Sequence, residues 1–202
     1  MTTFLILRHA QHDWVGRGIA GRQPQVSLND EGREQAQALV QRLQGVVIDA
    51  IWCSPQPRTQ QTAQPLAQAR GLPIQVHAGF DEVDMGDWEG MTFAQLDAVG
   101  EPWRHWVERR ASARPPGGEP FTDVPKRAMA GLRDLQDAQP NGTVVIVSHG
   151  DVIKSIVATV LNMSLDDLET FDIAPASITR LDMGANWRKL HLLNATGPRP
   201  LS

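Results

Sequence analysis

Short apolar runs alternate along the chain with stretches in which apolar residues recur at helical spacing. The runs at residues 3–8 and 143–148 are short, mostly apolar and rich in β-branched side chains, so they predict two buried strands. The stretch from Asn29 to about Gln44 predicts a helix, with Asn29 as the N-cap and Gly45 at its end. Its apolar face is formed by Ala36, Leu39, Val40 and Leu43.

The rest of the pattern continues this alternation. Strands are predicted over residues 49–53 and 74–77, and a closing hairpin around Gly184 over residues 177–183 and 187–193. Helices are predicted over residues 58–70, 92–99, 103–110, from the loop at 114–120 to about 137, and over 150–161. Such alternation predicts an α/β fold, a three-layer α/β/α sandwich with a mainly parallel sheet. Ligands of such sheets bind beyond the carboxyl ends of the strands.

Residues with catalytic chemistry follow the predicted strands. His9 ends the first strand, directly after Arg8, and His149 ends the strand at 143–148. Arg58 follows the second strand, and Glu82 lies in the acidic loop after the third. Guanidinium groups match phosphate oxygens, a neutral imidazole is a nucleophile, and a carboxylic acid can protonate a departing oxygen. The pattern therefore indicates phosphoryl chemistry, and it leaves open which histidine attacks.

Seven short motifs lie in order from Phe4 to about Leu161. They are LRHA at 7–10, GR at 21–22, SLNDEGREQA at 27–36, SPQPRTQQTA at 54–63, DEVDMGDWEG at 81–90, PPGGE at 115–119 and VSHG at 147–150. Together they resemble the histidine phosphatase superfamily, the phosphoglycerate-mutase-like proteins. The resemblance implies a single histidine phosphatase domain over residues 1–202, with a small helical cap region at about 91–120.

The resemblance also implies roles for individual residues. His9 would be the nucleophile that becomes phosphohistidine, and Glu82 would be the proton donor. The phosphate would be held by Arg8, Arg58 and His149. Further contacts to the substrate are expected from His12, Gly21, Arg22 and Gly150. Neither a metal ion nor a cofactor is implied.

The sequence departs from the family's pattern at four positions. Ala10 stands where glycine is usual, and Pro120 stands where serine is usual. His12 replaces a common threonine, and Val15 replaces an asparagine that often touches the phosphate. His12 and Val15 change positions that contact the phosphate in the family. The sequence therefore leaves the substrate preference and the catalytic rate open. At His12, an imidazole donor could replace a hydroxyl donor.

Composition narrows the class of protein. A net charge of −4 argues against a nucleic-acid partner, and no stretch is long and apolar enough to span a membrane. The N-terminus lacks the pattern of a signal peptide, so we expect a cytoplasmic protein. The one cysteine, Cys53, excludes an internal disulfide and is expected to be a small buried residue. The oligomeric state is open, a homodimer included.

The leading interpretation is a phosphomonoesterase that acts on a small phosphorylated metabolite. A phosphoglycerate-type mutase would use the same site, but resembling mutases carry a longer segment over it than residues 90–117 allow. Two other classes are a metal-dependent hydrolase, with zinc on His9, His12 and His149, and a non-catalytic module that binds phosphorylated ligands. Trp103 and Trp106 are expected to serve packing rather than substrate binding.

Overall fold

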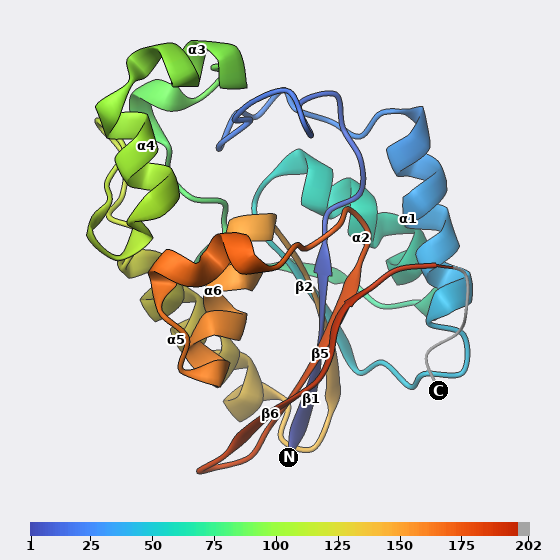
Figure 1. Cartoon of the computed structure of the whole chain (residues 1–202). Coiled ribbons are helices and arrows are strands. Elements are labelled where there is room, and N and C mark those ends of the chain that lie inside the picture. Colours follow the sequence, from blue (N-terminus) through green and yellow to red (C-terminus); the bar gives the residue numbers. More distant parts are fainter. Residues whose placement is uncertain (198–202) are drawn as a thin grey trace.

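The computed structural model describes residues 1–197 and is built around a six-stranded sheet in the order β3-β2-β4-β1-β5-β6 (Figure 1). The strands are β1 (Thr2–Arg8), β2 (Ala50–Cys53), β3 (Ile74–Val76), β4 (Thr143–Ser148), β5 (Ile178–Met183) and β6 (Arg188–Ala195). The strands β1 to β4 pair in parallel, whereas β5 pairs antiparallel with both β1 and β6. The prediction of a mainly parallel sheet that ends in a hairpin is therefore confirmed.

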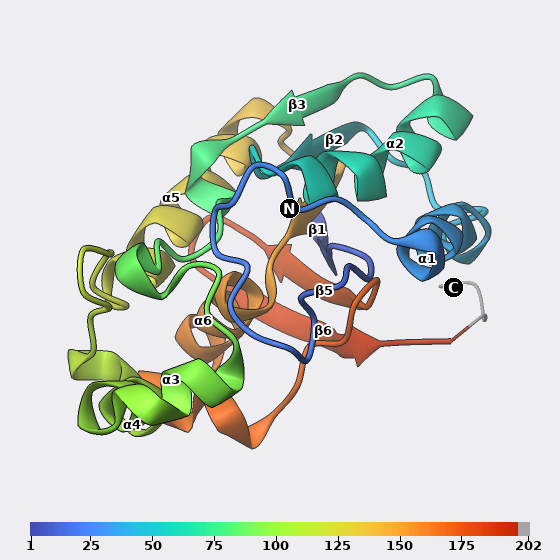
Figure 2. The same ribbon diagram turned by 90° about the horizontal axis from the view of Figure 1, so that it is seen from above.

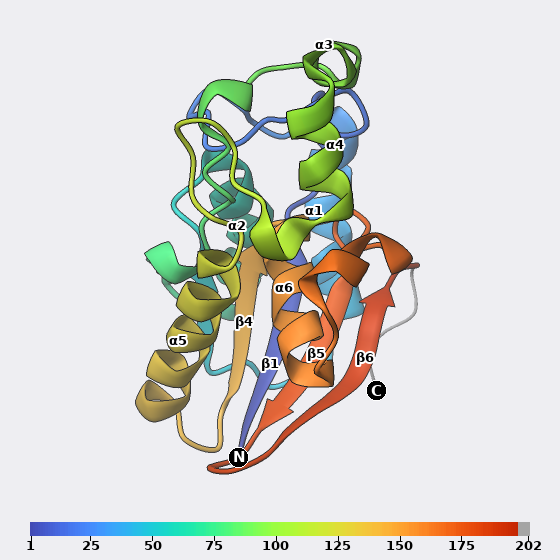
Figure 3. The ribbon, with the colours of Figure 1, turned by 60° about the vertical axis from the view of Figure 1, so that its left-hand side comes forward.

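Helices cover both faces of this sheet. They are α1 (Asp30–Arg42), α2 (Pro57–Arg70), α3 (Phe93–Val99), α4 (Glu101–Glu108), α5 (Asp123–Ala138) and α6 (Gly150–Leu161). The pair α1 and α2 lies on one face and the pair α5 and α6 on the other, so the three-layer prediction is confirmed (Figures 1 and 3). The short 3₁₀ turns Ala78–Phe80, Gly86–Trp88, Arg110–Ser112 and Leu165–Thr170 lie in the connections.

The alternation of side chains along β1 explains the two layers of helices. Leu5 and Leu7 belong to the hydrophobic cluster under α1 and α2, whereas Phe4 and Ile6 belong to the cluster under α5 and α6. Since successive side chains of a strand point to opposite faces, one fully apolar strand requires a layer on each side. The first strand and its two neighbours, β4 and β5, therefore lie in the centre of the molecule.

Local signals set the ends of the helices. The side chain of Asn29 accepts a hydrogen bond from the Gly32 amide at 2.9 Å and caps α1 as predicted. Thr92 forms a capping box with Gln95 at the start of α3. Gly71 ends α2 in the left-handed conformation, with φ at 64°, where glycine carries no steric penalty. These caps account for the agreement between predicted and observed bounds.

The cap segment, residues 91–120, lies above the carboxyl ends of the strands (Figure 3). Seen from above, the loop between β1 and α1 also crosses this end of the sheet (Figure 2). Trp103 and Trp106 both make edge-on contacts with the Trp88 ring, and Trp106 does the same with Phe121. Among the described residues, no helix combines the length and apolar character needed to cross a membrane.

Candidate active site

The two histidines meet at the carboxyl edge of the sheet. His9 directly follows β1 and His149 directly follows β4, and these strands are parallel neighbours in which Arg8 pairs with Ser148. The two imidazole rings are 5.3 Å apart between centroids, and both side chains are almost completely buried. The fold therefore brings together two residues that are far apart in the sequence, as the strand pattern predicts.

The orientation of the His9 ring leaves one nitrogen free for attack. Its Nδ1 atom lies 2.9 Å from the carbonyl oxygen of Ala10. A carbonyl oxygen only accepts, so Nδ1 carries the proton and Nε2 carries the lone pair. Burial, together with the charges of Arg8 and Arg58, holds the pKa of His9 well below its usual value. His9 is thus a neutral imidazole at neutral pH, which is the form a nucleophile requires.

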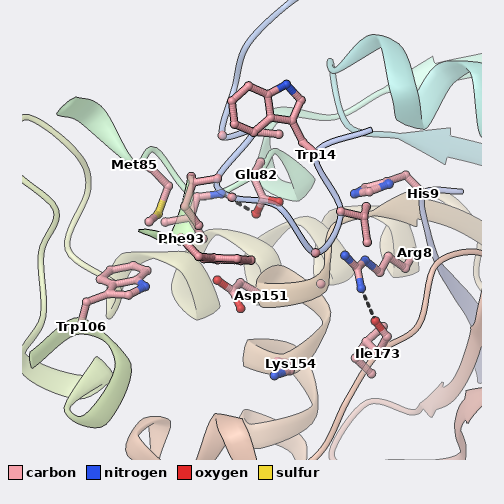
Figure 4. Close-up of a pocket in the computed structure, with 18 of the residues that line it drawn as sticks. Arg8, His9, Trp14, Glu82, Met85, Phe93, Trp106, Asp151, Lys154 and Ile173 are labelled. Carbon is pink, nitrogen blue, oxygen red and sulfur yellow. Dashed lines mark hydrogen bonds between the residues drawn. The ribbon is translucent and has the colours of Figure 1, made fainter. Parts of the chain in front are cut away.

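Two buried guanidinium groups flank His9 (Figure 4 shows Arg8). Arg8 donates from Nη1 to the carbonyl of Ile173 at 2.5 Å, and Arg58 donates from Nη2 to the carbonyl of Gly21 at 2.7 Å. Within residues 1–197, Nε of Arg8 and both Nε and Nη1 of Arg58 are buried without a hydrogen-bond partner. Such concentrated positive charge, poorly screened by water, favours an anion in the pocket.

His149 is held by a serine and an arginine. Its Nε2 atom is 2.7 Å from the Ser54 hydroxyl, and its Nδ1 atom is 3.2 Å from Nη2 of Arg58 and 3.4 Å from Oε2 of Glu82. Burial and the charge of Arg58 hold the pKa of His149 well below its usual value, so the ring is neutral at neutral pH. Because Arg58 can only donate, Nδ1 is then the acceptor and Nε2 carries the proton.

Glu82 lies beside this pair in the loop after β3. Burial, together with the charge of Asp151, raises its pKa to about 7 against the opposing effect of Arg58. Its Oε1 accepts a hydrogen bond from the amide of Val83 at 2.9 Å, and its Oε2 is 3.9 Å from Nη2 of Arg58. At neutral pH a large fraction of Glu82 is therefore protonated, as a general acid must be.

The loop that carries Glu82 is fixed by two arginines and one glutamate. Arg127 on α5 donates to the carbonyls of Asp81 at 2.7 Å and Glu82 at 3.1 Å. Arg22 donates from Nε to the same Glu82 carbonyl at 2.8 Å. Glu119 joins the two arginines, accepting from Nη2 of Arg22 at 3.0 Å and from Nη2 of Arg127 at 2.9 Å. The guanidinium of Arg22 is thus bound to the loop of the acid and does not line the pocket.

His12 is a third histidine in the pocket. Its ring lies 4.8 Å from that of His9, and its Nδ1 accepts a hydrogen bond from the Trp14 amide at 3.2 Å. The proton is therefore on Nε2. Burial lowers its pKa to about 4, and the charges of Arg58 and Arg8 lower it as well. A neutral imidazole donor thus takes the position expected for a hydroxyl.

A cavity of about 330 Å³ extends from His9 towards the cap segment. Gly21, Gly150 and Val15 line it near the two histidines. Its far part is lined by Phe93, Trp103, Trp106, Arg110, Asp151 and Lys154 (Figure 4 shows several of them). Trp103 and Trp106 therefore combine the expected packing with a place in the pocket wall, which sequence patterns alone did not indicate.

The same cluster has atoms that could hold a metal ion. One ligand atom each from His9, Glu82 and His149 lie within 4.8 Å of one another. The guanidinium of Arg58 lies within 4 Å of both Glu82 and His149, so a cation placed there would be repelled at short range. The zinc set of His9, His12 and His149 would meet the same repulsion, because Arg58 lowers the pKa of each of these rings.

Comparison with known proteins identifies the family. A family model described as the histidine phosphatase superfamily, branch 1, matches residues 4–196. The chain belongs to this superfamily. It is a histidine phosphatase, a phosphoric monoester hydrolase, as the motifs predict.

Several relatives of this histidine phosphatase are known. It is 30% identical to phosphoserine phosphatase 1 of Hydrogenobacter thermophilus over 97% of this chain and 93% of the relative. It is 28% identical to the adenosylcobalamin/alpha-ribazole phosphatase of Escherichia coli over 94% of each chain. The solved structure of YhfR from Bacillus stearothermophilus superimposes with a TM-score of 0.90 at 29% identity, over 98% of this chain and 99% of that one.

Three features of this histidine phosphatase were not predicted. Ser54 is part of a recognised motif, but its bond to His149 joins segments that are far apart in the sequence. Arg127, which holds the loop of Glu82, lies in no motif. Asp151 immediately follows the VSHG motif at 147–150, and this position was the one available signal for its place in the pocket.

Proposed function

We propose that the protein hydrolyses a small phosphate monoester in two steps, with His9 as the nucleophile and Glu82 as the acid and then the base. The unprotonated Nε2 of His9, held between the guanidinium groups of Arg8 and Arg58, is the observation that carries this proposal. His149 completes the phosphate site once its Nδ1 carries a proton. Further contacts come from His12, Gly21 and Gly150, whereas Arg22 acts by holding the loop of Glu82.

In the first step Nε2 of His9 attacks phosphorus and the bond to the alcohol oxygen breaks. The negative charge on the phosphoryl oxygens is met by Arg8 and Arg58, which are fixed before the substrate arrives. Glu82 gives its proton to the departing alkoxide, so the alcohol leaves neutral. The products of this step are phosphohistidine, a free alcohol and an ionised Glu82.

In the second step water attacks the phosphohistidine. Glu82, now a carboxylate, takes a proton from this water, and the bond between phosphorus and His9 breaks. Inorganic phosphate leaves, His9 is again neutral, and Glu82 is again protonated. One carboxyl group thus serves both steps, which requires a pKa near the working pH, and its pKa of about 7 fits this requirement.

The test is the loss of the nucleophile. His9→Ala should abolish hydrolysis of p-nitrophenyl phosphate, and wild-type enzyme quenched during turnover of ³²P-labelled ester should carry an acid-labile, base-stable phosphoryl group. His191→Ala, which removes an exposed histidine outside the pocket, is the matched control and should keep full activity. Wild-type activity in His9→Ala, or label on another residue, would show that the mechanism is wrong.

We further propose that the enzyme works without a metal ion, in the cytoplasm, on a small molecule rather than on nucleic acid. The arginine beside the three ligand atoms and the net charge of −4 support this. The cap segment then serves as the cover of the substrate pocket within a single domain. Activity after dialysis against a chelator tests the metal, and sedimentation equilibrium decides whether the protein forms a homodimer.

A further inference from the structure

The alcohol part of the substrate must lie in the far part of the cavity. The phosphoryl group occupies the end beside His9, so the leaving oxygen points towards the cap segment. We call this far part the leaving-group half. In Figure 4 the aromatic rings of Phe93 and Trp106 lie on one side of the pocket, and Arg8 and His9 lie on the other. Phe93 is 40% exposed, unusual for so large an apolar side chain, and its ring is available to a ligand.

The cations of the leaving-group half are already bound to carboxylates. Arg110 donates from Nη1 to Asp151 and from Nη2 to Glu169, both at 3.0 Å. Nζ of Lys154 is 3.4 Å from Oε2 of Glu169. Neither cation is free to pair with an anionic group of a substrate without losing one of these partners.

One exposed carboxylate, that of Asp172, lines the pocket near Arg8. Asp172 lines the pocket, and within residues 1–197 it makes neither a salt bridge nor a side-chain hydrogen bond. Burial lowers the pKa of Arg8, while the nearby charges of Glu82, Asp151 and Asp172 raise it, so Asp151 and Asp172 lie where the far part of the cavity borders on the phosphate end. Apart from Arg8, Arg58 and Glu82, the charged residues that line the pocket are three carboxylates and two cations, so the rest of the wall carries a net negative charge. The carboxylates are Asp151, Glu169 and Asp172, and the cations are Arg110 and Lys154.

Binding of the substrate increases this imbalance. A phosphate dianion neutralises Arg8 and Arg58, and Asp172, which forms no salt bridge within residues 1–197, then adds to the negative charge of the pocket. A second anion on the substrate would meet this negative charge without a free cation. An ammonium group would instead find carboxylates in the pocket wall and the exposed ring of Phe93, each of which favours a cation.

We propose, on the basis of the proposed phosphatase function, that the leaving-group half selects phosphate esters of amino alcohols and rejects esters whose alcohol carries a second anionic group. The selecting residues are Asp172 and Phe93, with Asp151 adding to the negative field. Phosphate esters of hydroxy acids are disfavoured for the same reason.

A series of three alkyl esters of similar size measures this selection. Phosphoethanolamine carries an ammonium group, propyl phosphate is its neutral counterpart, and phosphoglycolate carries a carboxylate. For the wild-type enzyme we expect kcat/KM to be about tenfold higher for phosphoethanolamine than for phosphoglycolate, with propyl phosphate between them. Hydrolysis of p-nitrophenyl phosphate in the same samples reports separately whether the enzyme is a phosphatase.

Two variants test whether the carboxylate of Asp172 causes this preference. Asp172→Asn should reduce the ratio of kcat/KM for phosphoethanolamine to that for phosphoglycolate by about twofold to fivefold, the size of a partly exposed charge pair. Because the ratio in the variant is compared with the same ratio in the wild type, differences in intrinsic reactivity between the two esters cancel. Asp167→Asn removes the same charge from an exposed position that does not line the pocket, and it should leave the ratio unchanged.

The outcomes distinguish failure of the inferred substrate preference from failure of the proposed phosphatase function. An equal or reversed preference in the wild type overturns the inference, and so does an unchanged ratio in Asp172→Asn or an equal effect of Asp167→Asn. These results leave the proposed phosphatase function intact as long as p-nitrophenyl phosphate is hydrolysed with dependence on His9. Loss of that hydrolysis in the wild type would contradict the proposed function itself.

Discussion

The Nε2 atom of His149 lies 2.7 Å from the hydroxyl of Ser54, a residue 95 positions earlier in the chain. In the neutral ring this bond places the proton on Nε2, because Arg58 donates to Nδ1 on the other side of the ring. A phosphoryl oxygen needs a donor at Nδ1. The serine hydroxyl can both donate and accept, so it can stabilise the ring in either tautomer.

Ser54→Ala should therefore impair phosphate binding. The buried Nε2 atom loses its partner, which costs about 1–2 kcal/mol, and we expect kcat/KM to fall roughly 5–30-fold. The inhibition constant of inorganic phosphate should rise in parallel. Ser155→Ala, which removes a buried serine that bonds only within α6, should change neither quantity. An unchanged inhibition constant in Ser54→Ala would rule out this role.

The dependence of activity on pH should reveal Glu82. Its raised pKa of about 7 means that the donor form predominates below pH 7 and is lost above it. For alkyl phosphates kcat/KM should then fall about tenfold per unit above pH 7, whereas aryl phosphates, which need little protonation, should show no such fall. Glu82→Gln should remove this dependence. His9 should add no loss of activity near neutral pH, because burial and the charges of Arg8 and Arg58 hold its pKa well below its usual value.

Substitution of Arg127, which holds the loop of Glu82, should impair proton donation without weakening phosphate binding. Arg127→Met removes the hydrogen bonds to the carbonyls of Asp81 and Glu82, and we expect kcat/KM for alkyl phosphates to fall about 10–100-fold. The inhibition constant of phosphate should stay the same. Arg133→Met, at an exposed position of the same helix, is the control. Equal losses on alkyl and aryl esters would contradict a positioning role.

The core under α1 offers a test of stability that is independent of catalysis. Leu39 is fully buried, and Leu39→Ala should lower the free energy of unfolding by about 2–5 kcal/mol in urea titrations. Gln37→Ala, on the exposed face of the same helix, should change it by less than about 0.5 kcal/mol. A loss below about 1 kcal/mol at Leu39 would mean that the surrounding side chains close the cavity.

Most of the fold was predictable because its signals are local. The bounds of β4 and α6 agree with those read from the apolar run that ends at His149 and the helix that follows it. Asn29 and Thr92 mark the starts of α1 and α3 through hydrogen bonds that span only three residues. The 3₁₀ turn Leu165–Thr170 was missed, because two leucines three positions apart in a stretch of six residues are too short a pattern to indicate a helix.

The site was predictable only in part, because contacts such as that of Ser54 with His149 join residues that are far apart in the sequence. The nucleophile, the arginines and the acid follow strands, and the topology of a parallel sheet brings such positions together. The motif at 21–22 suggested a substrate contact for Arg22, but its guanidinium is bound to the loop of Glu82 and to Glu119. Which surface a long side chain reaches depends on packing between distant segments, which periodicity does not encode.

The strand order has a consequence for the synthesis of the protein on the ribosome. β4 lies between β1 and β2 but is made after both, so the first 140 residues emerge with two unpaired strand edges facing each other. Edges of this kind are templates for wrong pairing, and contacts between distant residues form slowly. The insertion of β4 closes both edges and places His149 beside His9 in the same event. A nascent chain that stalls before β4 is made is therefore prone to aggregation. It also lacks His149, so its set of site residues for phosphoryl transfer is incomplete.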